Sequence, residues 1–205
     1  PMLTDTWDQP RPYNICAPMI GGKHCLVGCV ALALSQVMRY WRWPVVGHGT
    51  HTYVDSLGCG QTLTADFRHE YRWDLIRDVY RGAIDSSDVG LLEAGRLWRD
   101  CGVAVNMRYG LSASGAKSVR QAIALHTWFG YDGGMQFYYR DFFSQREWTD
   151  MLLTELSAGR PVLFAGHSLT LAHAIVCDGY DEDGYFHFNM GMGGVADGYY
   201  YLPHL

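Results

Sequence analysis

The chain has 205 residues, a net charge of −5, 48% hydrophobic and 18% charged residues. This length suffices for one domain, or for two lobes that share a cleft, around a real hydrophobic core. A negative balance without a basic stripe gives nucleic-acid binding no electrostatic support, and no stretch approaches the roughly 20 apolar residues of a membrane helix. We therefore expect neither nucleic acid nor membrane as a partner.

The first segment, residues 7–19, contains three prolines and is typical of an extended, turning chain. The pattern changes at Cys29, where apolar side chains cover most of a helical surface and Ser35, Gln36 and Arg39 occupy the remainder. Gly28 precedes this stretch and Pro44 follows it. The pattern predicts a largely buried helix that begins at or next to Cys29.

The rest of the chain divides into a helical part and a strand-rich end. We expect a loop with one short strand over residues 48–63, helices over 73–80, 87–101, 114–129 and 145–158, and strands over 103–109, 161–165, 172–178, 184–189 and 198–202. Because the helices dominate the first half and the antiparallel strands the end, the fold class is α+β with segregated elements.

The six cysteines show no zinc-ribbon spacing, and we expect neither a metal nor an organic cofactor. An even number permits disulfides in a secreted protein, although a chain of this length does not need them. If Cys29 is a catalytic thiol, an odd number remains, so at least one other thiol is free or pairs outside the chain.

Cys29 is the candidate nucleophile. A free thiol has a pKa of about 8.5, which a helix N-terminus and a neighbouring cationic histidine lower. Gly28 also removes a side chain where a substrate backbone approaches. Position alone leaves the alternative that Cys29 is a small buried hydrophobic residue.

The base has to be found among nine histidines. His173 lies at the start of an apolar strand that could hold its ring at the edge of a cleft. His167 in a polar loop is the nearest rival, and His187 alternates within a strand and could be an ordinary surface residue. The residue pattern alone leaves these alternatives open.

Two further residues could complete a cysteine–histidine site. The side-chain carbonyl of Asn189 could accept a hydrogen bond from histidine Nδ1 and orient the ring, although an asparagine before a glycine is also common in turns. The side-chain amide of Gln9 could donate to an oxyanion beside the Cys29 backbone N–H, although its position before a proline by itself favours an exposed polar residue.

Ordered blocks along nearly the whole chain resemble the streptopain family of bacterial cysteine peptidases, which includes interpain and periodontain. The blocks are WDQPRPYNICAP, GCVALALSQVMRYWRWPVVGHGTHTY, CGVAVNMRYG, GYDGGMQFYYRDFFSQREWTDMLLTELSAGRPVLFAG and AHAIVCDGYDEDGYFHFNMGMGGVADGYYYL. By position in these blocks, Cys29 matches the nucleophile, His173 the base and Gln9 the oxyanion donor. Asn189 matches the asparagine beside the family's active-site tryptophan.

The resemblance implies a papain-like fold, with a helical lobe carrying the cysteine, a β lobe carrying the histidine and a substrate cleft between them. It implies a secreted or cell-surface bacterial endopeptidase that acts on proteins or peptides and is made with an inhibitory propeptide. Residues 1–205 are then a single catalytic domain from which the propeptide and a C-terminal extension are absent. The resemblance also implies an apolar pocket for the residue before the scissile one, at a place it does not locate.

The chain departs from the family pattern after Asn189. The family usually has Asn-Trp-Gly-Trp-Gly-Gly, whereas this chain has Met190 and Met192 at the two tryptophan positions. Methionine is apolar and adaptable but offers no indole N–H and no rigid plane, which puts shielding of the histidine in question.

Three other functions are alternatives to an active peptidase. The first is a papain-like module that binds peptides with reduced or no turnover, and the second is another acyl transfer on the same scaffold, such as that of a transglutaminase or amidase. The third, a disulfide-stapled structural protein, requires most cysteines to be oxidised.

Overall fold

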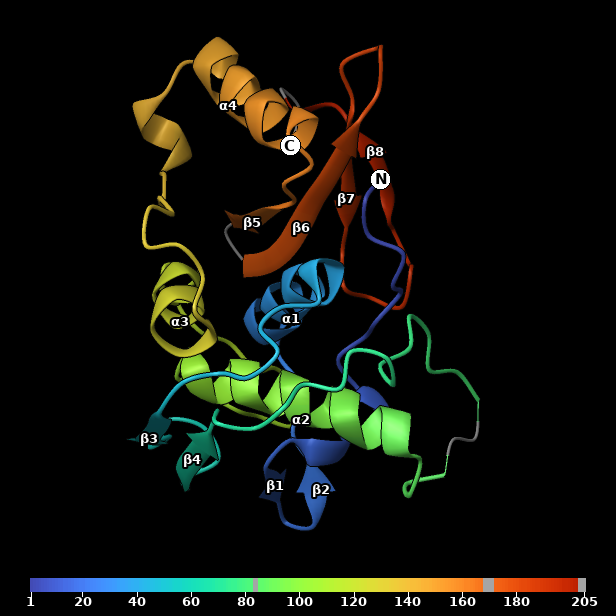
Figure 1. Cartoon of the computed structure of the whole chain (residues 1–205), viewed down its shortest axis with the longest axis vertical. Coiled ribbons are helices and arrows are strands. Elements are labelled where there is room, and N and C mark those ends of the chain that lie inside the picture. The colour runs from blue at the N-terminus through green and yellow to red at the C-terminus, as the bar shows by residue number, and fades with distance from the viewer. Residues whose placement is uncertain (83–84, 168–171, 203–205) are drawn as a thin grey trace.

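The structure is a computed structural model that describes residues 1–82, 85–167 and 172–202. The chain folds into a mainly helical part and a part built on an antiparallel sheet (Figure 1). The central helix α1 (Cys29–Trp41) contacts both the long helix α2 (Val89–Ala104) and strand β6 (Ala172–Tyr180). It therefore joins the two parts.

The helical part surrounds α1 and α2 with short elements. These are the 3₁₀ helix η1 (Tyr13–Cys16), the strand pair β1 (Met19–Ile20) and β2 (Lys23–His24), the strand pair β3 (Thr50–Val54) and β4 (Thr62–Asp66), and α3 (Arg120–Phe129). The 3₁₀ turn η2 (Arg140–Phe142) then leads towards the second part.

The second part is a four-stranded antiparallel sheet with one helix. Helix α4 (Gln145–Ser157) precedes β5 (Val162–His167), which pairs with β6, and β7 (Phe186–Asn189) and β8 (Gly198–Tyr200) follow in chain order. Ser144 caps α4, since its hydroxyl accepts from the Glu147 N–H while the Glu147 carboxylate accepts from the Ser144 N–H.

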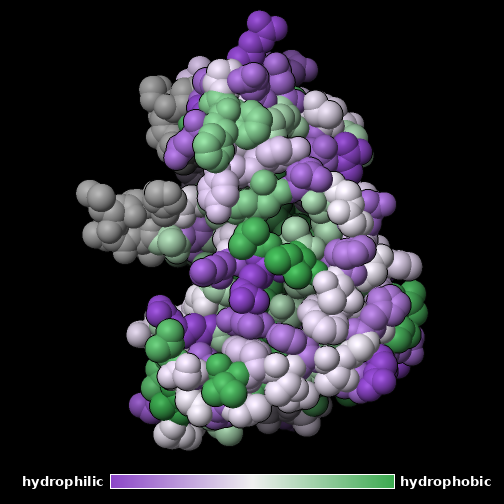
Figure 2. Space-filling model, turned by 90° about the vertical axis from the view of Figure 1, so that its left-hand side faces the viewer, coloured by the Kyte–Doolittle hydropathy of each residue, from purple (hydrophilic) through white to green (hydrophobic). Residues whose placement is uncertain are grey.

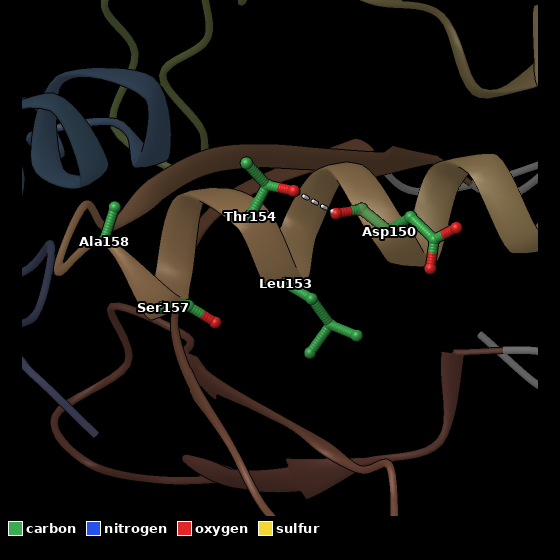
Figure 3. A pocket seen from close by; sticks show the side chains of 5 residues that line it. All are labelled: Asp150, Leu153, Thr154, Ser157 and Ala158. Carbon is green, nitrogen blue, oxygen red and sulfur yellow. Dashed lines mark hydrogen bonds between the residues drawn. The ribbon is translucent and has the colours of Figure 1, made fainter.

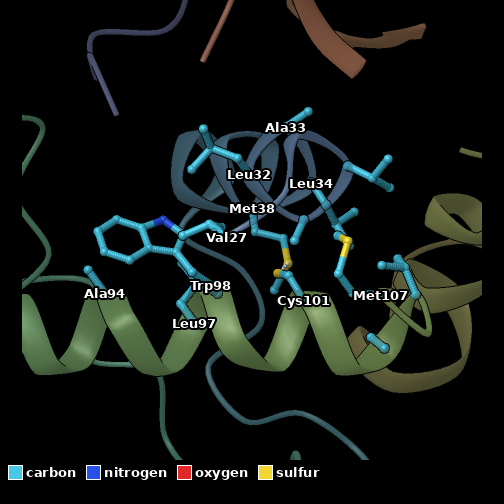
Figure 4. Close-up of a cluster of buried hydrophobic side chains, with 14 of the residues drawn as sticks. Val27, Leu32, Ala33, Leu34, Met38, Ala94, Leu97, Trp98, Cys101 and Met107 are labelled. Carbon is cyan, nitrogen blue, oxygen red and sulfur yellow. Dashed lines mark hydrogen bonds between the residues drawn. The ribbon is translucent and has the colours of Figure 1, made fainter. Parts of the chain in front are cut away.

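Helix α1 is buried on every side over its first two and a half turns. Nine consecutive residues from Val30 to Met38 are buried, including the polar Ser35 and Gln36. One side packs against α2, where Met38 and Leu34 lie near Leu97, Trp98 and Cys101 (Figure 4). The other side packs against the sheet, because Ala174 and Val176 of β6 belong to the same core. A helix between two layers has no solvent face, which explains its nearly continuous apolar sequence.

The opposite face of the sheet is covered by α4. Leu152 and Leu156 of α4 form a second buried cluster with Cys177, Phe186 and Phe188. Because alternate residues of β6 point to opposite faces, Val176 packs towards α1 and Cys177 towards α4. Strand β6 is thus paired on both edges and packed on both faces, beside α1.

The α+β expectation and the helix that begins at Cys29 are confirmed, and so are helices close to 87–101 and 145–158. The helix expected over residues 73–80 is wrong. Trp73, Ile76 and Tyr80 are buried at helix-like spacing, but they anchor an irregular segment. The Trp73 indole N–H donates to the Pro44 carbonyl and the Tyr80 hydroxyl to that of Gly90.

The strand expected over residues 103–109 is also wrong. Helix α2 continues through Gly102 to Ala104, and the missing side chain of Gly102 leaves room for the ring and hydroxyl of Tyr109. The alternating residues Val103, Val105, Met107 and Tyr109 are all buried, so alternation here does not mean a two-sided strand. Helix α3 begins at Arg120, later than expected, and strand β4 was not predicted.

All six cysteines are free thiols. The third alternative, a disulfide-stapled protein, therefore has no support. No helix within the described residues is both long and apolar enough to cross a membrane. Among those same residues, no group of histidine, cysteine and acidic side chains is arranged to hold a metal ion.

Candidate active site

Cys29 is the first residue of α1, and Gly28 forms the turn before it. Gly28 has a φ of 89°, which residues with side chains rarely adopt. A Cβ at this position would lie 2.7 Å from Sδ of Met107 and 3.1 Å from Cβ of Ser114. Only glycine therefore fits both the conformation and the space, and the turn places the half-buried Cys29 side chain at the positive end of the helix dipole.

His173, the second residue of β6, is the residue whose side chain shifts the pKa of Cys29. Burial raises the pKa of the Cys29 thiol, but the hydrogen bond with the His173 ring and bonds from the N–H groups of Ala174 and Val30 outweigh burial, so that the pKa is lowered overall. The same hydrogen bond raises the pKa of His173. Although one pKa is lowered and the other raised, both shifts favour the same state, a thiolate beside an imidazolium.

The other side of the His173 ring is held by the main chain. Nε2 lies 2.8 Å from the carbonyl oxygen of Met190. A carbonyl can only accept, so Nε2 carries a proton, and Nδ1 is left for the Cys29 thiol. The imidazole is therefore held in the tautomer that can take a proton from sulfur.

The expectation that the Asn189 side chain accepts directly from the His173 ring is corrected by this geometry. The Asn189 amide is buried and faces away from the ring: Nδ2 donates to the Asp5 carbonyl at 2.8 Å, and Oδ1 accepts from the Gly191 N–H at 3.0 Å. Gly191 N–H and Met190 C=O belong to one peptide unit. Asn189 consequently orients the carbonyl that holds His173, rather than the ring itself.

The loop after Asn189 has a second anchor in Asp197, which sequence reasoning missed. Its Oδ1 accepts from the Met190 N–H at 2.7 Å. Burial raises the pKa of Asp197.

The Met190 side chain is half-buried and packs against the cluster formed by α4 and the sheet, whereas Met192 is 44% exposed. Only the first of the two methionines is therefore part of the packed structure beside the histidine.

Gln9 is held next to the turn that leads into Cys29. Its backbone carbonyl accepts from the Val27 N–H at 3.1 Å, and its own N–H donates to the Asp8 carboxylate. Its side-chain amide is half-buried, and within the described residues it makes no hydrogen bond. It is thus an unengaged donor near the start of α1.

Of the two rival histidines, His187 has a described side chain, and it is engaged elsewhere. His187 is bonded through Nδ1 to the fully buried Asp178 at 2.6 Å, and the other oxygen of Asp178 accepts from the Leu3 N–H. This pair fastens the N-terminal segment to the sheet, so His187 is not an ordinary surface residue. His167 ends β5, and its side chain lies outside the described residues.

Two hollows lie away from the cysteine–histidine pair. A mostly apolar cavity of about 890 Å³ lies between α1, α3, α4 and β5, and its walls include Trp43, Tyr131, Phe143 and Trp148. Figure 2 faces the side of the molecule with these elements and shows hydrophobic residues gathered around a hollow. A shallower hollow of about 610 Å³ follows Asp150 to Ala158 along α4 (Figure 3). Cys29 and His173 line neither hollow.

A cysteine at the start of a central buried helix, paired with a histidine on an adjacent antiparallel sheet, defines the papain-like class of fold and site. Residues 7–200 match the model of the Peptidase C10 family, and the chain belongs to that family.

Relatives and solved structures agree with this membership. The chain is 35% identical over 198 residues to thiol protease/hemagglutinin PrtT of Porphyromonas gingivalis and 33% identical over 215 residues to streptopain of Streptococcus pyogenes. These alignments cover 96% and 97% of this chain, but only 23% of PrtT and 54% of streptopain, so the chain spans about a quarter to a half of those relatives.

The fold is similar to that of interpain A from Prevotella intermedia. The active wild-type cysteine protease and a prointerpain A fragment each match with a TM-score of 0.87 at 33% identity. The match covers 97% of this chain, 84% of the active enzyme and 63% of the fragment.

Proposed function

We propose that this chain is the catalytic domain of a cysteine endopeptidase. The observation that carries the proposal is the pairing of Cys29, at the start of α1, with a His173 ring whose far nitrogen donates to Met190 C=O. The pKa shifts of both partners favour the ion pair, which supplies a nucleophile without a separate deprotonation step.

In the proposed reaction the Cys29 thiolate attacks the carbonyl carbon of a peptide bond. The oxyanion that forms accepts hydrogen bonds from the Cys29 backbone N–H, which has no acceptor within the helix, and from the Gln9 side-chain amide. The His173 imidazolium gives its Nδ1 proton to the leaving amine, and a thioester remains on Cys29. Water, deprotonated by His173, then hydrolyses the thioester and restores the free thiol.

Names of the similar proteins support the biological setting as part of the proposal. They include thiol protease, streptopain and a prointerpain fragment, all from bacteria. We infer a secreted or cell-surface bacterial enzyme that acts on protein or peptide substrates and is made with an inhibitory propeptide. Residues 1–205 then form a single catalytic domain.

The test is hydrolysis of casein and of a fluorogenic peptide by the chain and by its Cys29→Ala variant. We expect the variant to lose activity to the limit of detection, because no other described side chain replaces the thiolate. Turnover by the variant equal to that of the parent chain would overturn the proposal. Mass spectrometry of the products formed in the presence of an amine acceptor distinguishes hydrolysis from transfer to the amine.

A second candidate, a peptide-binding module without useful turnover, is favoured by Met190 at the position of the family's tryptophan. A thiol-directed epoxide inhibitor distinguishes the two functions. Stoichiometric labelling of Cys29 that disappears in a His173→Ala variant supports the peptidase. Labelling that is slow and independent of His173 supports the binding module.

A further inference from the structure

We propose that Gln36 is a positioning residue of the cysteine–histidine site; this rests on the proposed peptidase function. Gln36 is a buried amide on α1 whose Nε2 donates to Asn189 Oδ1 at 2.8 Å and to Asp5 Oδ1 at 2.7 Å. It does not touch His173, so its effect on the ring passes through other groups.

A continuous chain of hydrogen bonds connects Gln36 to the base. Asn189 Oδ1 accepts from Gln36 and from the Gly191 N–H, and the carbonyl of that same peptide unit, Met190 C=O, accepts from His173 Nε2 at 2.8 Å. Donation from an amide N–H makes its carbonyl a better acceptor, by an estimated 10–30% per bond. The chain thus fixes the direction and the strength of the bond that holds the imidazole.

The orientation of each amide in this chain is determined by its neighbours. Asn189 Nδ2 faces the Asp5 carbonyl and Oδ1 faces the Gly191 N–H, so neither end of this amide can be exchanged. Gln36 therefore has to present its NH₂ group to Asn189. Its own Oε1 is buried and has no hydrogen-bond partner within the described part of the chain. An unsatisfied buried acceptor is costly, and methionine or leucine would avoid that cost.

The same helix carries the nucleophile and the positioning residue. Cys29 and Gln36 are seven residues apart on α1, which is about two turns and places them on one side of the helix. The loop packs closely on this side, since a Cβ on Gly191 would lie 2.8 Å from Cδ2 of Leu32. Helix α1 therefore sets the position of the thiol directly and that of the imidazole through Gln36.

The test compares Gln36→Met and Gln36→Glu with Ser35→Ala. Ser35 is a matched control because it is equally buried on α1, but its hydroxyl donates only to Leu32 C=O of the same helix. Methionine removes the donor. An ionised glutamate keeps the shape but presents only acceptors, so the Asn189 amide has to turn over and the Gly191 N–H loses its partner.

We expect both Gln36 variants to lower kcat on a peptide substrate by about tenfold to a hundredfold with little change in KM, and Ser35→Ala to retain the parent kcat. Urea unfolding is measured on each, and rates are compared under conditions where each variant is fully folded. If folded Gln36→Met and Gln36→Glu both keep the parent kcat, Gln36 has no positioning role.

A second readout does not depend on hydrolysis. The rate of Cys29 alkylation by iodoacetamide is measured as a function of pH. Because the ion pair is weakened in the Gln36 variants, we expect their alkylation rate to increase at a higher pH than that of the parent chain. An unchanged alkylation profile overturns the positioning role even if the chain proves to have no peptidase activity. Absent hydrolysis with a shifted alkylation profile overturns the proposed function and supports the role of Gln36.

Discussion

The imidazole of His173 donates to the backbone carbonyl of Met190 and not to the side chain of Asn189. A carbonyl acceptor fixes the tautomer as firmly as a side-chain acceptor does, because it cannot donate. The identity of the Met190 side chain is then free to vary without loss of this bond. What a change at residue 190 alters is the packing and the water around the ring.

The pH dependence of the rate of Cys29 alkylation tests the ion pair between Cys29 and His173. Burial opposes both shifts, yet the hydrogen bond that the two groups share lowers the pKa of the thiol and raises that of His173. The thiolate–imidazolium form should therefore exist above the lowered cysteine pKa and below the raised histidine pKa, which gives a bell-shaped pH profile of kcat/KM. In His173→Ala the thiolate loses its partner, and we expect iodoacetamide alkylation to require a pH at least one unit higher. Cys29→Ala provides the background from the other thiols, and an unshifted His173→Ala curve contradicts the pairing.

Replacing Gly28 by alanine should destabilise the chain and impair the site together. The added Cβ meets Met107 and Ser114 in a conformation that alanine rarely adopts. We expect a loss of about 2–4 kcal/mol in the free energy of unfolding, measured by urea denaturation, from strain and overpacking combined. Gly21→Ala is the matched control, because Gly21 also has a positive φ but has open space at its Cβ. Equal losses in the two variants would show that packing against Met107 contributes nothing.

Asp5 makes the stability of the fold depend on pH. Burial raises its pKa from 3.8 to about 7, although the hydrogen bond from Gln36 opposes this. Because the folded state holds the proton more tightly than the unfolded state, the stabilisation is complete below about pH 4 and is lost as the pH rises through 7.

An Asp5→Asn variant should remove this dependence, so the amount by which its free energy of unfolding exceeds that of the parent chain should grow by on the order of 2 kcal/mol between pH 5 and pH 8. Asp183→Asn, at an exposed turn, is the control. Parallel curves for the parent chain and Asp5→Asn between pH 5 and 8 contradict the assignment.

Met190→Trp tests the effect of the departure from the family pattern. The larger, rigid side chain should shield the His173 ring from water while the backbone bonds to His173 and Asp197 remain. We expect kcat/KM on a peptide substrate to rise severalfold. Met192→Trp is the comparison, since Met192 is exposed and should change little. A fall in activity on Met190→Trp, with stability intact, would show that the loop has adapted to methionine.

Asp197 offers a separate test of the loop anchor. Asp197→Ala removes the acceptor of the Met190 N–H, whereas Asp197→Asn can keep an oxygen in its place. We expect alanine to lower kcat by about tenfold and asparagine to retain most of it, because one buried hydrogen bond contributes roughly 1–3 kcal/mol when its partner is left unpaired. Peptide hydrolysis and urea unfolding, measured on both variants, separate loss of positioning from loss of folding. Identical kcat values for the two variants would contradict this role.

The sequence by itself determined the helix that begins at Cys29, the α+β order of elements and the blocks that mark the family. These are local signals: a largely apolar stretch bounded by Gly28 and Pro44, with few polar residues, predicts a buried helix. Periodicity was misleading where buried residues are held by contacts remote in sequence, as with the Trp73 indole against the Pro44 carbonyl and the Tyr109 N–H against the Asp55 carboxylate.

Only the tertiary structure decided how the base is held. Gln36 looked like part of a polar remainder on α1, yet it is 1% exposed because the sheet covers that side of the helix. A buried glutamine in an otherwise apolar helix is a signal in the sequence, but its partners Asp5 and Asn189 lie 31 and 153 residues away. Pairings over such distances depend on how the two parts of the chain pack, and no local pattern encodes them.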